Sequence, residues 1–169
     1  MKHNTQIIFL VGFLFSIPIA LTSYLNSSFL STFINEKSVG IIYALASLSS
    51  IIALLLAPKI WRIIGGYKFL LLIAFLDIVS LLSFSIVKNS WSAVITFIVF
   101  FSLNTLIVFS LDELLKIFSK DSATGTIRGI YLAICSSAWI LAQLASGTVL
   151  GEFSFRGIYM LGFLVMVLF

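Results

Sequence analysis

The chain has 169 residues, of which 61% are hydrophobic and only 9% are charged. An ordinary soluble domain carries about 25% charged residues, and a soluble fold of this length could not bury so much apolar surface. The composition therefore predicts an integral membrane protein that has the lipid bilayer as its solvent. We interpret the formal net charge of +4 as basic residues left at one membrane face, which disfavours nucleic acid as a partner.

Long apolar runs predict the secondary structure, because about 20 apolar residues in a helix cross the hydrocarbon core of a bilayer. The polar stretch 26–38 is expected to lie at the membrane interface, and Pro58 is expected to end the second helix. The last run reaches Phe169 without a polar end, so we expect the sixth helix to be incomplete. The predicted fold class is all-α, a single polytopic transmembrane domain over residues 1–169, with helices at about 6–26, 38–57, 67–87, 91–112, 127–150 and 156–169.

The basic residues predict the orientation of these helices. With the amino terminus inside, three of the ten Lys and Arg residues lie outside, namely Lys37, Lys88 and Arg156. The other seven are cytoplasmic: Lys2, Lys59, Arg62, Lys68, Lys116, Lys120 and Arg128. This positive-inside bias predicts a cytoplasmic amino terminus, and we expect the protein in a bacterial inner membrane.

The sequence contains one histidine, His3, and one cysteine, Cys135. Cys135 sits inside an apolar run, so the chain has neither a disulfide framework nor a thiolate metal site. His3 precedes the first run, which leaves no histidine for a catalytic or metal cluster in the membrane. We therefore expect no metal and no cofactor. An enzyme is disfavoured as well, because there is no Glu/His pair and no Gly-x-Ser-x-Gly motif.

The two halves of the chain carry similar residues at the same spacing. The matched stretches include Phe15-Ser16 with Phe101-Ser102, Gly40-Ile41 with Gly129-Ile130, and Tyr67-Lys68 with Phe155-Arg156. Because each copy has an odd number of helices, the second copy enters the membrane with the opposite polarity. The pattern predicts an inverted 3+3 repeat, which is found inside the halves of many secondary transporters.

On these features the chain resembles the amino-terminal half of a major facilitator superfamily transporter. The segment from Pro58 to Lys68 is similar to the loop between helices two and three of that family, with Gly66 and Lys68 at its glycine and final basic positions. The stretch 124–129, which leads into helix five, is also similar. The resemblance implies a missing carboxyl-terminal half of six helices as a partner.

The loop departs from the family pattern where an acidic residue is expected, since Arg62 and Ile63 occupy that neighbourhood. We therefore expect Asp112 and Glu113, at the inner end of helix four, to pair with Lys59 or Arg62 instead. The candidate residues for the cytoplasmic loop and for gating are Lys59, Arg62, Gly66, Lys68, Asp112, Glu113 and Arg128.

Asp77 is a carboxylate near the middle of the third apolar run. Such groups are costly in a membrane and usually face a bundle interior or a water-filled path. In one interpretation Asp77 is a protonatable coupling group or a counter-charge for the substrate. In the other it is a buried residue that holds helix three to its neighbours, through Ser80 or hydroxyls on helices one and two. The resemblance favours the second, because it implies that helix three is peripheral to the cavity.

Asn104 in helix four and Gln143 in helix five could contact a substrate or bond to neighbouring helices. In the repeat alignment Asn104 matches Pro18 of helix one, and the resemblance implies that helices one and four line the cavity. Ser16 belongs to a stripe of small residues typical of close helix packing. The candidate substrate and coupling residues are therefore Asp77, Asn104, Gln143, Ser16 and Pro18.

The function expected from these features is secondary active transport of a small solute by alternating access, with or without a coupling proton. Two alternatives stay open: a six-helix substrate-capture subunit that relies on a separate motor, and a non-transporting membrane scaffold subunit. The gene beyond Phe169 would separate them. Another six helices would support the transporter, and an early stop codon would support a subunit or scaffold.

Overall fold

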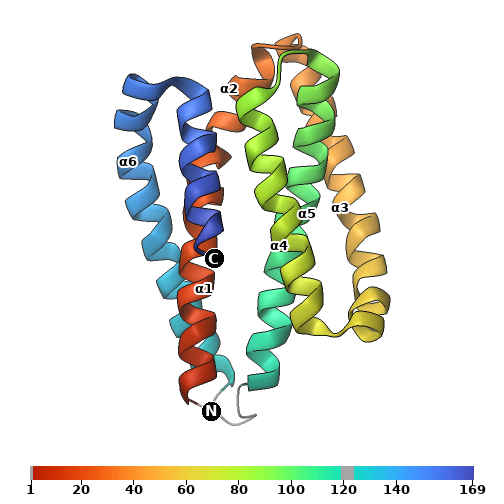
Figure 1. Cartoon of the computed structure of the whole chain (residues 1–169), viewed down its shortest axis with the longest axis vertical. Helices are drawn as coiled ribbons and strands as arrows, with labels where there is room; N and C mark the ends of the chain where they lie inside the picture. Colours follow the sequence, from red (N-terminus) through yellow and green to blue (C-terminus); the bar gives the residue numbers. More distant parts are fainter. Residues whose placement is uncertain (1, 119–123) are drawn as a thin grey trace.

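A computed structural model describes residues 2–118 and 124–169, and all regular secondary structure in these residues is helical. Within α6 the chain reverses at Ser154, where φ is 62° and ψ is 179°, so α6 consists of two antiparallel helical segments (Figure 1). The elements are α1 (Lys2–Ser23), α2 (Leu25–Ser31), α3 (Glu36–Ile64), α4 (Gly66–Ile86), α5 (Ser90–Phe118) and α6 (Thr124–Val167).

Among the described residues, five helical stretches are long and apolar enough to cross a membrane. They are Asn4–Ser23, Glu36–Ile64, Gly66–Ile86, Ser90–Phe118 and Gly125–Ala145. The second segment of α6, Ser154–Val167, is also apolar but shorter. Large apolar side chains such as Leu55 and Leu144 are exposed on the outer faces. Apolar helices with apolar outer faces indicate an integral membrane protein.

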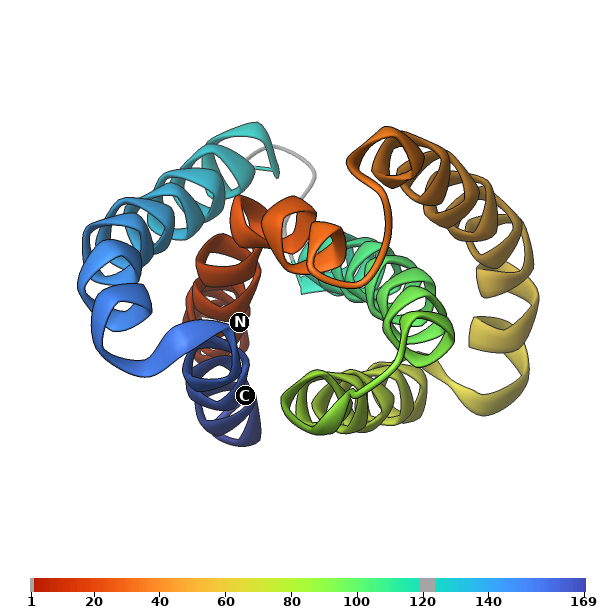
Figure 2. The ribbon, with the colours of Figure 1, turned by 90° about the horizontal axis from the view of Figure 1, so that it is seen from above.

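The helices form one bundle in which α1 and α5 take the central positions (Figure 2). α1 packs against α6 and α5, whereas α5 packs against α3 and α4, and α4 meets α6. We call the end that carries α2 and the connection between α4 and α5 the α2 end. The opposite end, with the amino terminus, the junction of α3 with α4 and the start of α6, is the N-terminal end (Figure 1).

Small residues allow α1 to approach both segments of α6 closely. A Cβ atom on Gly12 would overlap the ring of Tyr131 in the first segment, and a Cβ on Gly162 would lie 3.4 Å from the Cβ of Pro18. Lipid tails give helices no hydrophobic reason to associate, so close packing of this kind is a main source of stability in membranes.

The prediction that Pro58 ends the second helix was wrong. α3 continues through Pro58 to Ile64. A proline has a helical φ and removes only one backbone hydrogen bond, which membrane helices tolerate. Gly65 alone separates α3 from α4, and its φ of 85° is one that favours glycine. Gly66 begins α4 against the ring of Trp61, with no room for a Cβ. The segment from Pro58 to Lys68 is therefore mostly helical and is not the loop that the sequence predicted.

The polar stretch after the first helix also contains more structure than expected. α1 ends at Ser23 and is followed by the separate helix α2, which buries Asn26, Phe29 and Leu30. Asn35 then caps α3, because its side chain accepts a hydrogen bond from the backbone N–H of Lys37 at 3.0 Å. α2 therefore packs into the bundle instead of lying only at an interface.

Candidate functional site

Asp77 on α4 is only 1% exposed, and it accepts a hydrogen bond from Asn104 Nδ2 on α5 at 3.2 Å. The predicted partner Ser80 does not bind the carboxylate, because its hydroxyl donates to the backbone carbonyl of Asp77 at 2.8 Å. The structure therefore brings together two of the candidate residues, from the third and fourth apolar runs. An amide N–H that donates to a buried carboxylate offsets part of the free-energy cost of burying that group.

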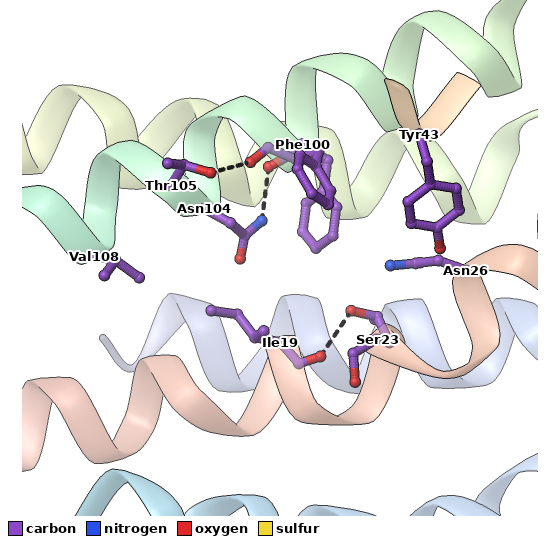
Figure 3. Close-up of a pocket in the computed structure, with 10 residues that line it drawn as sticks. Ile19, Ser23, Asn26, Tyr43, Phe100, Asn104, Thr105 and Val108 are labelled. Atoms are coloured by element: carbon purple, nitrogen blue, oxygen red, sulfur yellow. Dashed lines mark hydrogen bonds between the residues drawn. The ribbon is translucent and has the colours of Figure 1, made fainter. Parts of the chain in front are cut away.

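The nitrogen and the oxygen of the Asn104 amide differ in their hydrogen bonds. Its Nδ2 group also donates to the carbonyl of Phe100, at 2.7 Å, so both amide protons are used. Its Oδ1 atom is buried and has no hydrogen-bond partner. This oxygen points from α5 toward α1 (Figure 3). An acceptor left unsatisfied inside a protein is uncommon and calls for an explanation.

A cavity of about 360 Å³ lies between α1, α2, α3 and α5, and Asn104 but not Asp77 is in its lining (Figure 3). Its walls combine amide and hydroxyl groups with aromatic rings and carry no charged side chain. The lining residues are Ile19, Thr22, Ser23, Asn26, Tyr43, Phe100, Phe101, Asn104, Thr105 and Val108. Asn104 is thus the link between the cavity and the buried carboxylate.

A second cavity, of about 280 Å³, continues this face toward the N-terminal end and shares Thr105 and Val108 with the first. It is bordered by an ion pair between Asp112 on α5 and Arg128 on α6, at 3.0 Å. Lys116 lies 3.3 Å from Asp112 and 2.6 Å from Glu113. The two cavities are neighbours along α5, the first with amide and hydroxyl groups in its wall and the second with an ion pair at its border.

The predicted pairing of Asp112 and Glu113 with Lys59 or Arg62 was wrong. In the part of the chain that the structure describes, neither Lys59 nor Arg62 forms an ion pair. The end of α5 lies near the start of α6, whereas α3 ends beside α4 on the other side of the bundle (Figure 1). Lys59, Arg62 and Lys68 are exposed there.

The remaining candidates lie outside the lining of the first cavity. Gln143 Nε2 donates to the carbonyl of Ala20 at 2.7 Å, which fastens α6 to α1. Ser16 donates to the carbonyl of Gly12 at 2.8 Å, within its own helix. Pro18 packs against Gly162 and does not face Asn104 across the cavity.

Sequence reasoning missed several residues of the cavity, although helical spacing could have indicated them. Ile19, Thr22, Ser23 and Asn26 follow one another at intervals of three, one and three positions, which puts them on one helix face. The polar stretch that begins at Asn26 was assigned to the interface, so this continuity was not apparent. Tyr43 could not have been found, because nothing in its sequence neighbourhood distinguishes it from a lipid-facing residue.

No protein-family model matches this chain, and no curated protein matches it. Among the described residues, no group of three or more His, Cys, Asp or Glu side chains could hold a metal ion. The arrangement consists of a buried carboxylate, an amide beside it, and a cavity with polar groups between apolar helices.

Proposed function

We propose that this protein is a secondary active transporter of a small solute, built like one half of a major facilitator superfamily transporter. The observation that carries the proposal is the pair formed by Asp77 and Asn104, beside a mainly apolar cavity that carries amide and hydroxyl groups. Carboxylates and cavities of this kind inside a membrane domain usually belong to the path of a substrate or an ion.

The packing of the helices supports an inverted repeat. In the proposed repeat, α1 corresponds to α5, and α3 and α4 correspond to the two segments of α6. In agreement with this, α1 packs mainly on α6, and α5 packs mainly on α3 and α4. Each half also has a tyrosine near the start of its second helix, although the alignment of Gly40 with Gly129 places Tyr43 opposite Leu132 and not opposite Tyr131. Tyr131, near the start of α6, packs against Phe9 of α1, and Tyr43, near the start of α3, packs against Phe97 of α5. Inverted repeats in transporters hold the substrate near the interface of the repeats.

The distribution of charge supports an orientation with the N-terminal end in the cytoplasm of a bacterial inner membrane. Six basic residues of the described chain belong to helices at that end, namely Lys2, Lys59, Arg62, Lys68, Lys116 and Arg128. Lys37, Lys88 and Arg156 lie at the α2 end. Basic residues accumulate on the cytoplasmic side of membrane proteins.

The two least buried of the long helical stretches, Glu36–Ile64 and Gly125–Ala145, are equivalent in this repeat. Each packs mainly on one central helix, α5 or α1, and leaves much of its surface free. We propose that these faces contact lipid and a second six-helix bundle, against which this one rocks. Asp77 takes up and releases a proton as the solute enters and leaves, through its contact with Asn104.

The test is flux in proteoliposomes that carry the protein expressed from its complete gene. A panel of small solutes is offered with and without a pH gradient, and proton movement is recorded with a dye inside the vesicles. We expect at least one solute to accumulate with the gradient, and Asp77→Asn to reduce that accumulation to near background. Ser110→Ala is the control, because Ser110 is buried on α5, bonds only within its helix and lies outside the cavity lining.

Gradient-driven flux that is unchanged in Asp77→Asn would remove Asp77 from the coupling role. Failure of every solute to move would contradict the transporter and favour a subunit or a scaffold.

A further inference from the structure

Three hydroxyls of the first cavity offer acceptors, whereas the Asn26 amide nitrogen and the Tyr43 hydroxyl, which also line it, can donate. The hydroxyl of Thr22 donates to the carbonyl of Pro18 at 2.9 Å, and that of Thr105 donates to the carbonyl of Phe101 at 3.0 Å. Ser23 likewise donates to the carbonyl of Ala20, at 3.2 Å. Each hydroxyl has one proton and two acceptor lone pairs, so only the lone pairs remain for a bound molecule.

Asn104 adds a further acceptor to this set. Both of its amide protons are taken by Asp77 and Phe100, and its Oδ1 atom has no partner. A ligand that displaced the groups covering this oxygen and donated a hydrogen bond to it would satisfy an atom that is otherwise costly to keep buried. A ligand whose acceptors faced this wall would leave every one of these oxygens unpaired.

The carboxylate of Asp77 is connected to the first cavity through Asn104. Among the described residues no basic side chain lines this cavity, although Arg128 borders the neighbouring cavity in its ion pair with Asp112. Between Phe69 and Leu111 the charged residues are Asp77 and Lys88. Lys88 is exposed in the connection between α4 and α5, whereas Asp77 is hydrogen-bonded directly to Asn104 of the cavity wall. In a medium of low dielectric constant this carboxylate attracts a cation far more strongly than it would in water.

The apolar part of the wall is aromatic. Tyr43 from α3 and Phe100 and Phe101 from α5 border the same space, and the Tyr43 hydroxyl points toward Asn26 at the far end (Figure 3). Aromatic rings attract organic cations through their faces and also accept an apolar body.

From these observations we infer that the cavity binds an organic cation whose primary ammonium group donates to Asn104 Oδ1 and whose aromatic or aliphatic body lies between Tyr43 and the two phenylalanines. This inference rests on the proposed transport function and names the class of its solute. An ammonium group supplies three donors and a positive charge, which matches both the acceptors and the carboxylate.

Binding is tested with three probes that share one skeleton: 2-phenylethylammonium, 2-phenylethanol and 3-phenylpropanoate. The chain of 169 residues is placed in nanodiscs of zwitterionic lipid, and heats of binding are measured against nanodiscs without protein. We expect the ammonium to bind about tenfold or more tightly than the alcohol, and the carboxylate not to bind. Asn104→Leu should weaken ammonium binding by about tenfold, with little change for the alcohol, and Ser110→Ala should behave like the wild type.

Thr105→Val is a second variant that keeps the side-chain shape and removes one acceptor, in case Asn104→Leu does not fold. It should weaken ammonium binding by several-fold, about the effect of one neutral hydrogen bond. Equal affinity for the ammonium and the alcohol, tightest binding of the carboxylate, no binding of any probe, or no effect of either variant would overturn the inference.

The two proposals fail in different ways. Gradient-driven flux of a neutral or anionic solute would keep the transporter and remove the cation site. Ammonium binding that depends on Asn104, without flux of any solute, would keep the site and remove the transporter.

Discussion

The two ends of the bundle are held together by different interactions. At the α2 end, Phe29 packs against Phe33, Phe84, Phe155 and Tyr159. At the N-terminal end, Asp112 forms ion pairs with Lys116 and Arg128, and Glu113 forms one with Lys116, all with partly exposed side chains. The N-terminal end also has aromatic contacts, between Phe9 and Tyr131 and around Trp61. It differs from the α2 end in having ion pairs that water and salt can reach, of which Asp112–Arg128 joins two helices.

A buried hydrogen bond reinforces the aromatic cluster of the α2 end. The Tyr159 hydroxyl donates to Asn26 Oδ1 at 2.7 Å, and the Tyr159 ring stacks on Phe84 with centroids 4.4 Å apart. Aromatic pairs contribute about 0.5–1.5 kcal/mol each, whereas exposed ion pairs contribute about 0–1 kcal/mol. The comparison teaches that salt can weaken contacts at the N-terminal end, whereas the aromatic cluster of the α2 end is protected from it.

The largest effect is expected for Phe29→Ala. The substitution removes every ring contact that joins α2 to α4 and α6, so the free energy of unfolding should fall by at least about 2 kcal/mol. Reversible unfolding by dodecyl sulfate in mixed micelles, followed by circular dichroism, measures the change. Phe75→Ala is the control, because Phe75 is 62% exposed on α4. If both variants lose the same stability, the aromatic cluster does not hold the α2 end.

A smaller effect is expected for Tyr159→Phe, which keeps the ring and removes the hydroxyl. Asn26 Oδ1 then loses its donor in a buried place, and the free energy of unfolding should fall by about 1 kcal/mol. The same micelle titration measures it, with Tyr67→Phe as the control because the Tyr67 side chain is exposed. An unchanged midpoint for Tyr159→Phe would mean that the hydrogen bond adds nothing to the packing.

The smallest effect is expected for Arg128→Gln, which breaks the ion pair with Asp112. The free energy of unfolding should fall by less than about 1 kcal/mol, and the difference from wild type should vanish at about 1 M salt. Arg62→Gln is the control, since Arg62 forms no ion pair among the described residues. A loss for Arg128→Gln that exceeds that of Tyr159→Phe and persists at high salt would reverse the comparison of the two ends.

The long helices could be predicted from sequence because lipid imposes a length and a composition on each of them. Their ends were less predictable. Pro58 predicted a helix end, but one lost hydrogen bond is too small a cost to stop α3. α2 was not predicted as a separate helix, because its polar residues indicated an interfacial connection. In the structure its apolar side chains and Asn26 pack inward.

The candidate site was predictable only in part. Asp77 and Asn104 were each identifiable as polar residues in apolar runs, but their contact depends on how α4 packs against α5. Neither hydropathy nor spacing determines which faces of two helices meet, so Ser80 was the nearer but incorrect partner for the carboxylate. The ion pair of Asp112 with Arg128 was missed for the same reason.

The single-residue junction at Gly65 has a mechanical consequence. With one glycine between α3 and α4, the chain has no slack at this point, and neither helix end can shift far without pulling on the other. α3 carries Tyr43 and α4 carries Asp77. A displacement of the end of α3 would therefore displace the start of α4. We expect the position of Tyr43 in the cavity wall and the position of the Asp77 carboxylate to change together.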